Sequence, residues 1–503
     1  MTHAAGQPRI SNLLVATMAC LAIVSGMVIA NEALLHWFVL PVLLCGIVIG
    51  QDAVEYLSGR MPMFDPVGIL ALFGVHFFFL APLLHVYWDS YLESYIEQPR
   101  EWRDWLGYMA LLNLAGVLLY RIAAQRAALW GATALRSRWE CQRSAMLWAC
   151  LAGLLVAGSI QMAVYVSRGG IGGYIAAMTA DVGVGEADSA DTGMGIVFMV
   201  SESFPILALI FYAVATQRKR YLKLTFVILG VFVAFFILKM LFGGLRGSRS
   251  SIIWALFWAA GIVHVWIKPL SRHFVVLGLS FLVAFMYLYG FYKGLGKDVL
   301  VAMEEGRLTD NAQRGWSSML LGDLGRSDVQ AFLLYRIVRE SSDYQLAWGR
   351  TYLGSVALLI PRGIWPDRPP IKTKEGTDVM FGAGTYDRGD WYSSKVYGIA
   401  GETMLNFGPW PVPFAYLLFG MIVGRLQWFL RKLEPGDTRL LIYPFIVTWC
   451  FSIIQSDSDN LLFNFIKDGM TPLTVVFVGS RRLGRPEPGA PARRELSHAP
   501  ASL

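Results

Sequence analysis

The chain has 503 residues, of which 55% are hydrophobic and 14% aromatic, while only 16% are charged. Soluble globular proteins carry about 25% charged residues, and a soluble fold of this length has too little interior for so much apolar surface. The composition therefore excludes an ordinary cytosolic enzyme and favours a membrane protein. The formal net charge of +7 could suggest a nucleic-acid partner, but the positions of the basic residues fit membrane orientation better, so no nucleic acid is expected.

Apolar stretches of about 17–25 residues predict transmembrane helices, because a helix needs roughly 20 residues to cross the hydrocarbon core. The first apolar run, Leu13–Ala30, is too long for the core of a signal peptide and predicts an anchor. Twelve helices are predicted, near residues 11–30, 33–50, 66–87, 105–124, 145–166, 196–215, 221–242, 251–267, 273–291, 410–430, 440–455 and 461–480. We therefore expect an all-α integral membrane protein. Lys467, Asp468 and Pro472 interrupt its last helix.

Basic residues gather in alternate connections between the predicted helices. They lie at 121–143, 218–223, 268–272, 425–439 and 481–482. The short connections on the other side are neutral or acidic, as in 167–195, where Arg168 is the single base. By the positive-inside rule, this asymmetry predicts that both termini lie in the cytoplasm.

One long segment, residues 292–409, separates the ninth and tenth predicted helices and falls on the outer side. Its 118 residues include 14 basic and 14 acidic side chains, so we expect it to be folded and functional. Within it, Val329–Glu340 predicts an amphipathic helix lying on the membrane or on the spans, and Leu353–Ile360 a short re-entrant piece. The chain thus divides into helices 1–9 (residues 1–291), the large outer segment (292–409), helices 10–12 (410–482) and a disordered tail (483–503).

Ionisable residues inside membrane spans are costly and often functional. Glu202 in the sixth predicted helix and Lys239 in the seventh lie near the outer ends of their helices, roughly 6–9 Å deep by helix rise. They predict a site open to the outer face. The alternative is that each extends its polar end to the membrane surface or makes one interhelical hydrogen bond.

A glycine- and serine-rich turn follows Lys239 directly, with the sequence GGLRGSRSS at residues 243–251. Arg246 and Arg249 lie on the outer side, where the charge rule does not explain them. Glycines let the backbone fold closely, serines favour helix N-termini, and arginine matches phosphate oxygens. This turn predicts a site for an anionic group, with contact to lipid headgroups as the alternative.

The large outer segment contains a proline-rich strap, IPRGIWPDRPPIK, at residues 360–372. Its four prolines predict a rigid extended conformation. Arg362, Arg368 and Lys372 would then be presented to a ligand, and Trp365 would stack on a sugar or pack on the membrane. A connector with solvated charges is the alternative.

The segment GETMLNFG, residues 401–408, leads into the tenth predicted helix. Glu402 and Asn406 are four residues apart and are therefore expected on one helix face. Glu402 would accept a proton from a sugar hydroxyl or pair with an arginine as a structural element.

Residues 292–409 contain no histidine and no cysteine, which argues against Ser-His or Cys-His nucleophilic catalysis in this segment. A carboxylate metal site at Asp457 and Asp459 is possible. We prefer a mechanism without a metal or other cofactor, in which guanidinium groups neutralise a diphosphate leaving group.

These motifs, in this order along a chain with many predicted spans, resemble the bacterial O-antigen (oligosaccharide repeat-unit) polymerases of the Wzy type. The likeness at residue level is confined to about 243–425, and Asp367-Arg368 stands where such proteins often carry a lysine before proline. The resemblance implies a GT-C-like glycosyltransferase of the inner membrane with its active site on the periplasmic face. It would join repeat units carried on undecaprenyl diphosphate into O-antigen, capsule or exopolysaccharide, and release undecaprenyl diphosphate.

Applied to this sequence, the resemblance implies that Arg246, Arg249 and Arg362 neutralise the diphosphate. Glu402 is the candidate general base, with Asp390 as an alternative, and Asn406 would orient a sugar. The implied partners are a flippase and a chain-length regulator. Two rival functions stay open. An O-antigen ligase would be favoured by a catalytic histidine in the outer segment, and a secondary transporter by inverted repeats and charges near the bilayer midplane.

Overall fold

The structure is a computed structural model of the whole chain. It describes residues 8–92, 98–130, 135, 137–180, 199–217, 219–246, 249–295, 304, 316–339, 344–360, 364–389 and 395–484. Within these ranges the side chains of several residues, including Arg246 and Arg249, lie outside the description. The described chain is mostly helical, in agreement with the predicted fold class.

The first part of the chain forms most of the long helices. In order, they are α1 (Pro8–Ala30), α2 (Val39–Leu57), α3 (Pro66–Val75), α4 (Ala81–Tyr87), α5 (Trp102–Leu129), α6 (Arg143–Ser167), α7 (Gly170–Ala180), α9 (Phe204–Thr216), α10 (Thr225–Leu241), α11 (Arg249–Ile262) and α12 (Arg272–Leu295). Single π-helical turns continue two of them, His76–Leu80 after α3 and Val263–Ile267 after α11.

The helices that follow α12 in the described part of the large segment are short. They are α15 (Ser327–Val338), α16 (Arg350–Ala357), α17 (Lys372–Phe381), α18 (Thr385–Arg388) and α19 (Gly398–Phe407). The chain then forms α20 (Val412–Lys432), α21 (Tyr443–Gln455), α22 (Ser458–Asn464) and α23 (Thr471–Val478). A π-helical turn, η10 (Phe465–Met470), joins α22 to α23.

Nine helices in the described part of the chain are long and apolar enough to cross a membrane. They are Ser11–Ala30, Val39–Leu57, Pro66–Tyr87, Trp102–Leu129, Arg143–Ser167, Met199–Thr216, Ser250–Ile267, Val412–Lys432 and Ser458–Val478. Three shorter apolar helices, Thr225–Leu241, Val276–Phe291 and Tyr443–Gln455, occupy the other predicted positions. The described chain is therefore mostly helical and compatible with the predicted all-α membrane protein, whereas a span count of twelve stays a prediction.

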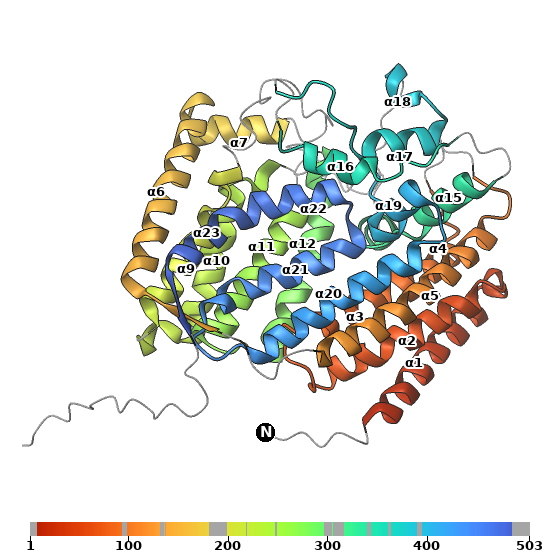
Figure 1. The fold of residues 1–503 in the computed structure, drawn as a ribbon, viewed down its shortest axis with the longest axis horizontal. Coiled ribbons are helices and arrows are strands. Elements are labelled where there is room, and N and C mark those ends of the chain that lie inside the picture. Colours follow the sequence, from red (N-terminus) through yellow and green to blue (C-terminus); the bar gives the residue numbers. More distant parts are fainter. Residues whose placement is uncertain are drawn as a thin grey trace, which may run out of the picture.

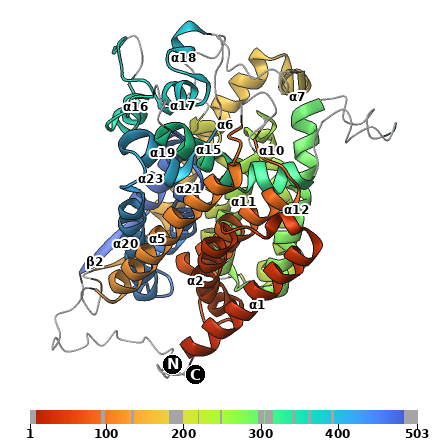
Figure 2. The ribbon, with the colours of Figure 1, turned by 90° about the vertical axis from the view of Figure 1, so that its right-hand side faces the viewer.

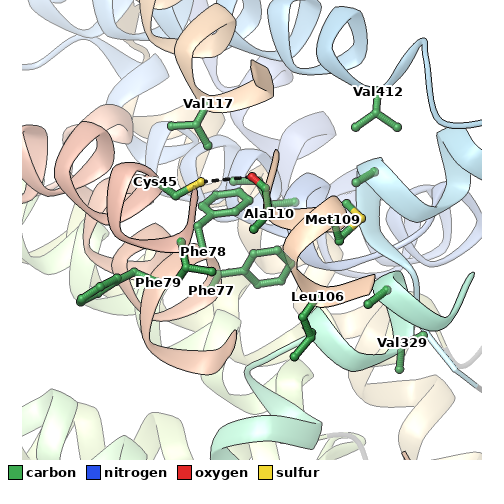
Figure 3. Close-up of a cluster of buried hydrophobic side chains, with 14 of the residues drawn as sticks. Cys45, Phe77, Phe78, Phe79, Leu106, Met109, Ala110, Val117, Val329 and Val412 are labelled. Carbon is green, nitrogen blue, oxygen red and sulfur yellow. Dashed lines mark hydrogen bonds between the residues drawn. The ribbon is translucent and has the colours of Figure 1, made fainter. Parts of the chain in front are cut away.

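Among the described residues, the two largest hydrophobic cores hold most of the helices together. The larger core lies between α2, α3, α5, α15, α19 and α20 and contains the aromatic run Phe77–Phe79. In Figure 3, Phe77 and Phe78 point toward α5, and the Cys45 thiol donates to the Ala110 carbonyl at 3.6 Å. The smaller core lies between α6, α9, α10, α11 and α23. Helix α21 contributes Phe451 to the larger core and Phe445 to the smaller one, and so connects them.

The short helices of the large segment gather at one end of the bundle. Figure 1 shows α7 and α16–α18 at the top with α15 and α19 below them on the right, whereas α1 begins at the bottom. Figure 2 shows strand β2 at the lower end as well. The two ends of the described chain therefore lie on the same side of the bundle, opposite the large segment.

A small antiparallel sheet departs from the predicted all-helical fold. Strand β1 (Ser137–Cys141) pairs with β2 (Ser480–Gly484), with Trp139 opposite Arg482. Arg138 and Arg439 lie here, where Arg439 pairs with Asp437 at 2.6 Å. The strands connect the segment before α6 to the segment after α23, a long-range pairing that the local sequence does not indicate.

Two predicted pieces of the large segment can be located. Helix α15 covers most of the predicted amphipathic helix and buries Val329, Phe332 and Leu333 in the larger core. It therefore lies on the spans. The predicted re-entrant piece 353–360 overlaps α16, which packs on α22 and buries Thr351 and Ser355.

Candidate functional site

Glu402 is the centre of a buried hydrogen-bond cluster that joins three helices. Its Oε1 accepts from the Thr351 hydroxyl at 2.8 Å and from the Ser458 hydroxyl at 2.5 Å. Its Oε2 accepts from the backbone N–H of Ser458 at 2.7 Å. Only 3% of Glu402 is exposed. The carboxylate therefore connects α19 to α16 and to the beginning of α22, and it does not face solvent directly.

Asn406 extends this cluster by one helical turn. Its amide nitrogen donates to Thr351 Oγ1 at 2.7 Å and to the Glu402 carbonyl at 2.8 Å. Its side-chain oxygen accepts from the Gly349 N–H at 2.9 Å. Glu402 and Asn406 thus share one helix face as predicted, and both contact Thr351. The fully buried amide fixes the loop before α16 onto α19.

Lys372 and Asp457 form a second buried contact beside Glu402. Their charged atoms are 2.6 Å apart, and Lys372 Nζ also donates to the Lys395 carbonyl at 2.6 Å. Asp457 Oδ1 accepts from the N–H groups of Tyr397 and Gly398 at 2.9 Å each, at the start of α19. The end of the proline-rich strap is therefore tied to the residue that precedes Ser458.

The pKa of Glu402 is raised from its ordinary value of 4.5 to about 7. Burial is the main cause, and the nearby Asp457 carboxylate adds to it, whereas the hydrogen bonds from Ser458 and Thr351 oppose it. A carboxyl whose pKa lies near neutral pH suits general acid–base chemistry. A hydrogen-bonded structural carboxyl in a dry site would show the same shift.

Glu202 and Lys239 belong to a separate cluster of four charged residues inside the bundle. Lys239 Nζ lies 3.7 Å from Glu202 Oε2 and 3.5 Å from Asp468 Oδ1. Lys467 Nζ lies 2.9 Å from the same Glu202 oxygen. Two cations and two carboxylates balance each other, as buried charges must.

The structure buries this cluster rather than opening it to the outer face. Glu202 is 4% exposed and Lys239 is 1% exposed. The adjoining cavity has a volume of only about 30 Å³. The prediction that Glu202 and Lys239 form a site open to the outer face is therefore wrong. Both residues are buried in a network of ion pairs with Lys467 and Asp468 of the last long helix.

The glycine- and serine-rich turn lies directly against this cluster. Gly243 has φ +109°, and a Cβ at this position would lie 2.3 Å from Glu202 Cδ. Helix α11 begins at Arg249, so Ser250 and Ser251 lie in its first turn, whereas Ser248, directly before the helix, lies outside the described residues. Ser251 Oγ accepts from Lys467 Nζ at 3.4 Å. The side chains of Arg246 and Arg249 lie outside the described residues.

One helix, Ser458–Val478, carries contacts to both clusters. Ser458 at its start binds Glu402, and Lys467 binds Glu202 and Ser251. Lys467 follows Ser458 by nine positions, which corresponds to a rise of about 13 Å along a helix. Lys467 lies in η10, and such single π-turns occur preferentially at functional sites.

The other predicted site residues have different surroundings. Trp365 is 37% exposed on the strap. The Arg368 guanidinium donates to the Ile360 carbonyl at 3.0 Å and also contacts the carbonyls of Ala357 and Leu358. Arg368 thus fixes the strap to the end of α16. Arg362 and the alternative base Asp390 lie outside the described residues.

Among the described residues, no three His, Cys, Asp or Glu side chains come together as a metal site. In the alternative metal pair, Asp457 is engaged by Lys372 and two N–H groups. Asp459 is also buried, and its carboxylate accepts from the Asn460 N–H. The donor set at this pair therefore does not fit a metal ion.

Sequence reasoning missed Thr351 and Ser458 as partners of Glu402, and Lys467 and Asp468 as partners of Glu202. The hydroxyl residues carry no local signal. Lys467 and Asp468 do carry a signal in the sequence, because they are two charges inside an apolar span and such charges need partners.

The sequence matches no protein-family model, and neither a similar curated protein nor a similar solved structure was found.

Proposed function

We propose that this chain is an oligosaccharide repeat-unit polymerase, a glycosyltransferase of the Wzy type with a GT-C-like fold. One observation supports the proposal most strongly. The proline-rich strap, the GETMLNFG segment and the RGSRSS segment all contact the helix Ser458–Val478 or the residue directly before it. The strap contacts Asp457 through Lys372, the GETMLNFG segment contacts Ser458 through Glu402, and the RGSRSS segment contacts Lys467 through Ser251. The RGSRSS segment lies more than 100 residues before the other two motifs, yet all three adjoin Ser458–Val478, as the parts of one active site would.

In this proposal the basic residues serve the leaving group. Arg246, Arg249 and Arg362 neutralise charge that develops on the diphosphate of the donor as its bond to the sugar breaks. Lys239 and Lys467 lie beside the same turn and support its position. No metal ion and no cofactor is required.

The proposed proton acceptor is Glu402, acting through Ser458. Both Glu402 oxygens are occupied and the residue is buried, whereas Ser458 is partly exposed. The acceptor sugar hydroxyl gives its proton to Ser458 Oγ while the Ser458 proton moves to Glu402 Oε1. The acceptor oxygen bonds to the anomeric carbon, the bond from that carbon to the diphosphate oxygen breaks, and undecaprenyl diphosphate leaves.

The cellular setting follows from the same proposal. The chain would lie in the bacterial inner membrane with both termini cytoplasmic and the large segment, residues 292–409, in the periplasm. Its substrates would be glycans on undecaprenyl diphosphate, supplied by a flippase, and a chain-length regulator would be a partner. Arg138 on β1 and Arg482 on β2, at the end of the bundle opposite α15–α19 (Figure 2), support this orientation.

One observation favours a secondary transporter as a second candidate. Lys467 lies near the middle of the helix Ser458–Val478, where transporters place coupling charges. A transporter would need an ion gradient and would release no undecaprenyl diphosphate, so the two candidates differ in their products.

A glycan ladder tests the proposal in cells. In a strain that lacks the chromosomal copy, the intact chain should restore long polysaccharide, whereas Arg246→Ala and Arg362→Ala should leave single repeats. Arg138→Ala is the matched control. This half-exposed arginine lies on β1, away from the proposed site, and pairs with Glu434. If the deletion strain carries lipid A-core without any attached repeat unit, the chain would instead be an O-antigen ligase. Normal ladders with both arginine variants would remove these residues from the mechanism.

A further inference from the structure

A hollow of about 530 Å³ lies in front of α16, and the polymerase site proposed above does not use it. Gln345, Leu346, Ala347, Trp348 and Arg350 line it. These residues form the loop that enters α16, beside the end of α19. The loop is therefore next to the Glu402 cluster but faces outward.

Trp348 is held in this loop in an unfavourable backbone conformation. Its φ is +48°, and the following Gly349 has φ +88°. The N–H groups of Ala347 and Trp348 donate to the carbonyls of Leu405 and Asn406 at 3.0 and 2.9 Å. A bulky residue with positive φ persists only where its surroundings impose it, and such strain gathers at ligand sites.

The same loop leaves the Trp348 ring in the open. The side chain is 74% exposed. It makes an edge contact with Phe407 at 6.3 Å between ring centres, and Phe407 in turn stacks on Tyr352 at 6.3 Å. Backbone bonds thus fix the position of the ring, while its large apolar face lacks the cover that a core residue has.

Polar groups stand beside this ring. Arg350 Nη2 lies 3.0 Å from Glu375 Oε1, and 54% of the Arg350 side chain is exposed. Tyr344 donates its hydroxyl hydrogen to Glu375 Oε2 at 3.2 Å and to the Leu405 carbonyl at 3.0 Å, so Glu375 is fixed. Gln345 adds an exposed amide. The hollow therefore combines one aromatic face with two planar hydrogen-bonding groups, of which Arg350 is positioned by Glu375.

We infer that this hollow, the Trp348 pocket, binds saccharide. The apolar face of a pyranose ring packs on an exposed tryptophan, and its hydroxyls match the forked donors of arginine and the donor–acceptor pair of an amide. The inference rests on the proposed function in one respect, because a polymerase must hold an acceptor glycan near Glu402. Asn406 connects the Trp348 pocket to the Glu402 cluster, since its side chain binds both Thr351 in the cluster and Gly349 in the loop.

Binding of a lipid-free sugar tests this inference without any catalysis. The probe is the repeat-unit oligosaccharide released from the source strain's lipid carrier, titrated by calorimetry into the purified full chain in nanodiscs. Trp348→Ala should weaken binding at least roughly tenfold, as truncation of a central aromatic anchor does, and Trp348→Phe should keep most of it. Gln345→Ala should weaken binding less and provides a second variant with an intact backbone.

Trp148→Ala is the matched control, because Trp148 is equally open, at 70% exposure, but lies on α6 at the far edge of the bundle (Figure 1). Unchanged affinity in Trp348→Ala, or equal losses in both tryptophan variants, would overturn the inference. Quenching of Trp348 by brominated lipids would also overturn it, because the residue would then be a membrane anchor. If the chain binds the sugar but releases no undecaprenyl diphosphate from lipid-linked repeat units, the saccharide pocket is supported and the proposed polymerase activity is contradicted.

Discussion

Ser458 binds Glu402 twice, through its backbone N–H at 2.7 Å and through its hydroxyl at 2.5 Å. The two residues are 56 positions apart in sequence. This contact fixes the start of the last long helix against α19, and Thr351 adds α16 to the same carboxylate. Whatever its part in catalysis, Glu402 is therefore expected to matter for stability.

Glu402→Ala should destabilise the chain by about 2 kcal/mol or more, because it leaves the backbone N–H of Ser458 and the hydroxyls of Thr351 and Ser458 without their acceptor. Glu402→Gln should cost less, since the hydroxyls can rotate to accept from the new amide. Thermal unfolding of the purified protein in detergent measures both. Glu434→Ala, at a half-exposed ion pair with Arg138, is the control and should change stability little. Equal stability of the Ala and control variants would contradict the structural role.

The raised pKa of Glu402 predicts a pH dependence. Between its ordinary value of 4.5 and about 7, the folded chain holds a proton that the unfolded chain releases. The free energy of unfolding should therefore fall as the pH rises through this window, by at most about 3 kcal/mol for this residue. Glu402→Gln cannot titrate, so its unfolding temperature should fall less between about pH 5 and 7.5. The same fall in both proteins would argue against the shift.

Gly243→Ala should disturb the ion cluster around Glu202. The position has φ +109°, and the added Cβ would meet Glu202 Cδ at 2.3 Å. The variant should lose stability by roughly 1–3 kcal/mol and shorten the glycan ladder. Gly230→Ala on α10 meets no atom within 4 Å and should be neutral or slightly stabilising. If both variants unfold at the same temperature, the close packing of Gly243 against Glu202 does not contribute to stability.

Lys467 and Glu202 should be energetically coupled. Lys467→Met alone leaves Glu202 with the more distant Lys239 and should cost about 3 kcal/mol, as removal of one partner of a buried pair does. The double variant Glu202→Gln/Lys467→Met removes one charge of each sign and should cost less than the sum of the single changes. A double-mutant cycle by thermal unfolding measures the difference. Additive losses would show that the two residues do not interact.

Topology can be tested with reporters. A fusion after Arg339, at the end of α15, should report the periplasm, and a fusion after Gly484, at the end of β2, should report the cytoplasm. Both follow from the basic residues that gather at the end of the bundle opposite α15–α19. A cytoplasmic signal after Arg339 would invert the proposed orientation and exclude a periplasmic site.

The positions of the helices could be predicted because each membrane helix is a continuous local signal. In the part of the chain that the structure describes, nine helices of sufficient length and three shorter ones lie at the predicted places. Helix α15 was also predictable, from its apolar spacing. The β1–β2 sheet was not, because Ser137–Cys141 pairs with a strand more than 300 residues away.

The candidate site was predicted only in part, and for the same reason. Residues four apart on one helix, Glu402 and Asn406, were placed on one face correctly. Partners from distant helices were not foreseen, so Lys372 was expected at a ligand but lies against Asp457. Long-range ion pairs depend on how helices pack, and a single sequence does not determine that.

The proposed polymerase joins lipid-diphosphate-linked repeat units. The direct measurement uses the purified chain in nanodiscs without an ion gradient, undecaprenyl-diphosphate-linked repeat units as sole substrate, and EDTA present throughout. We expect a ladder of lengthened glycans and one undecaprenyl diphosphate released for each unit joined, with both lost in Arg246→Ala. Intact single repeats and no released diphosphate from the well-folded chain would contradict the proposed activity.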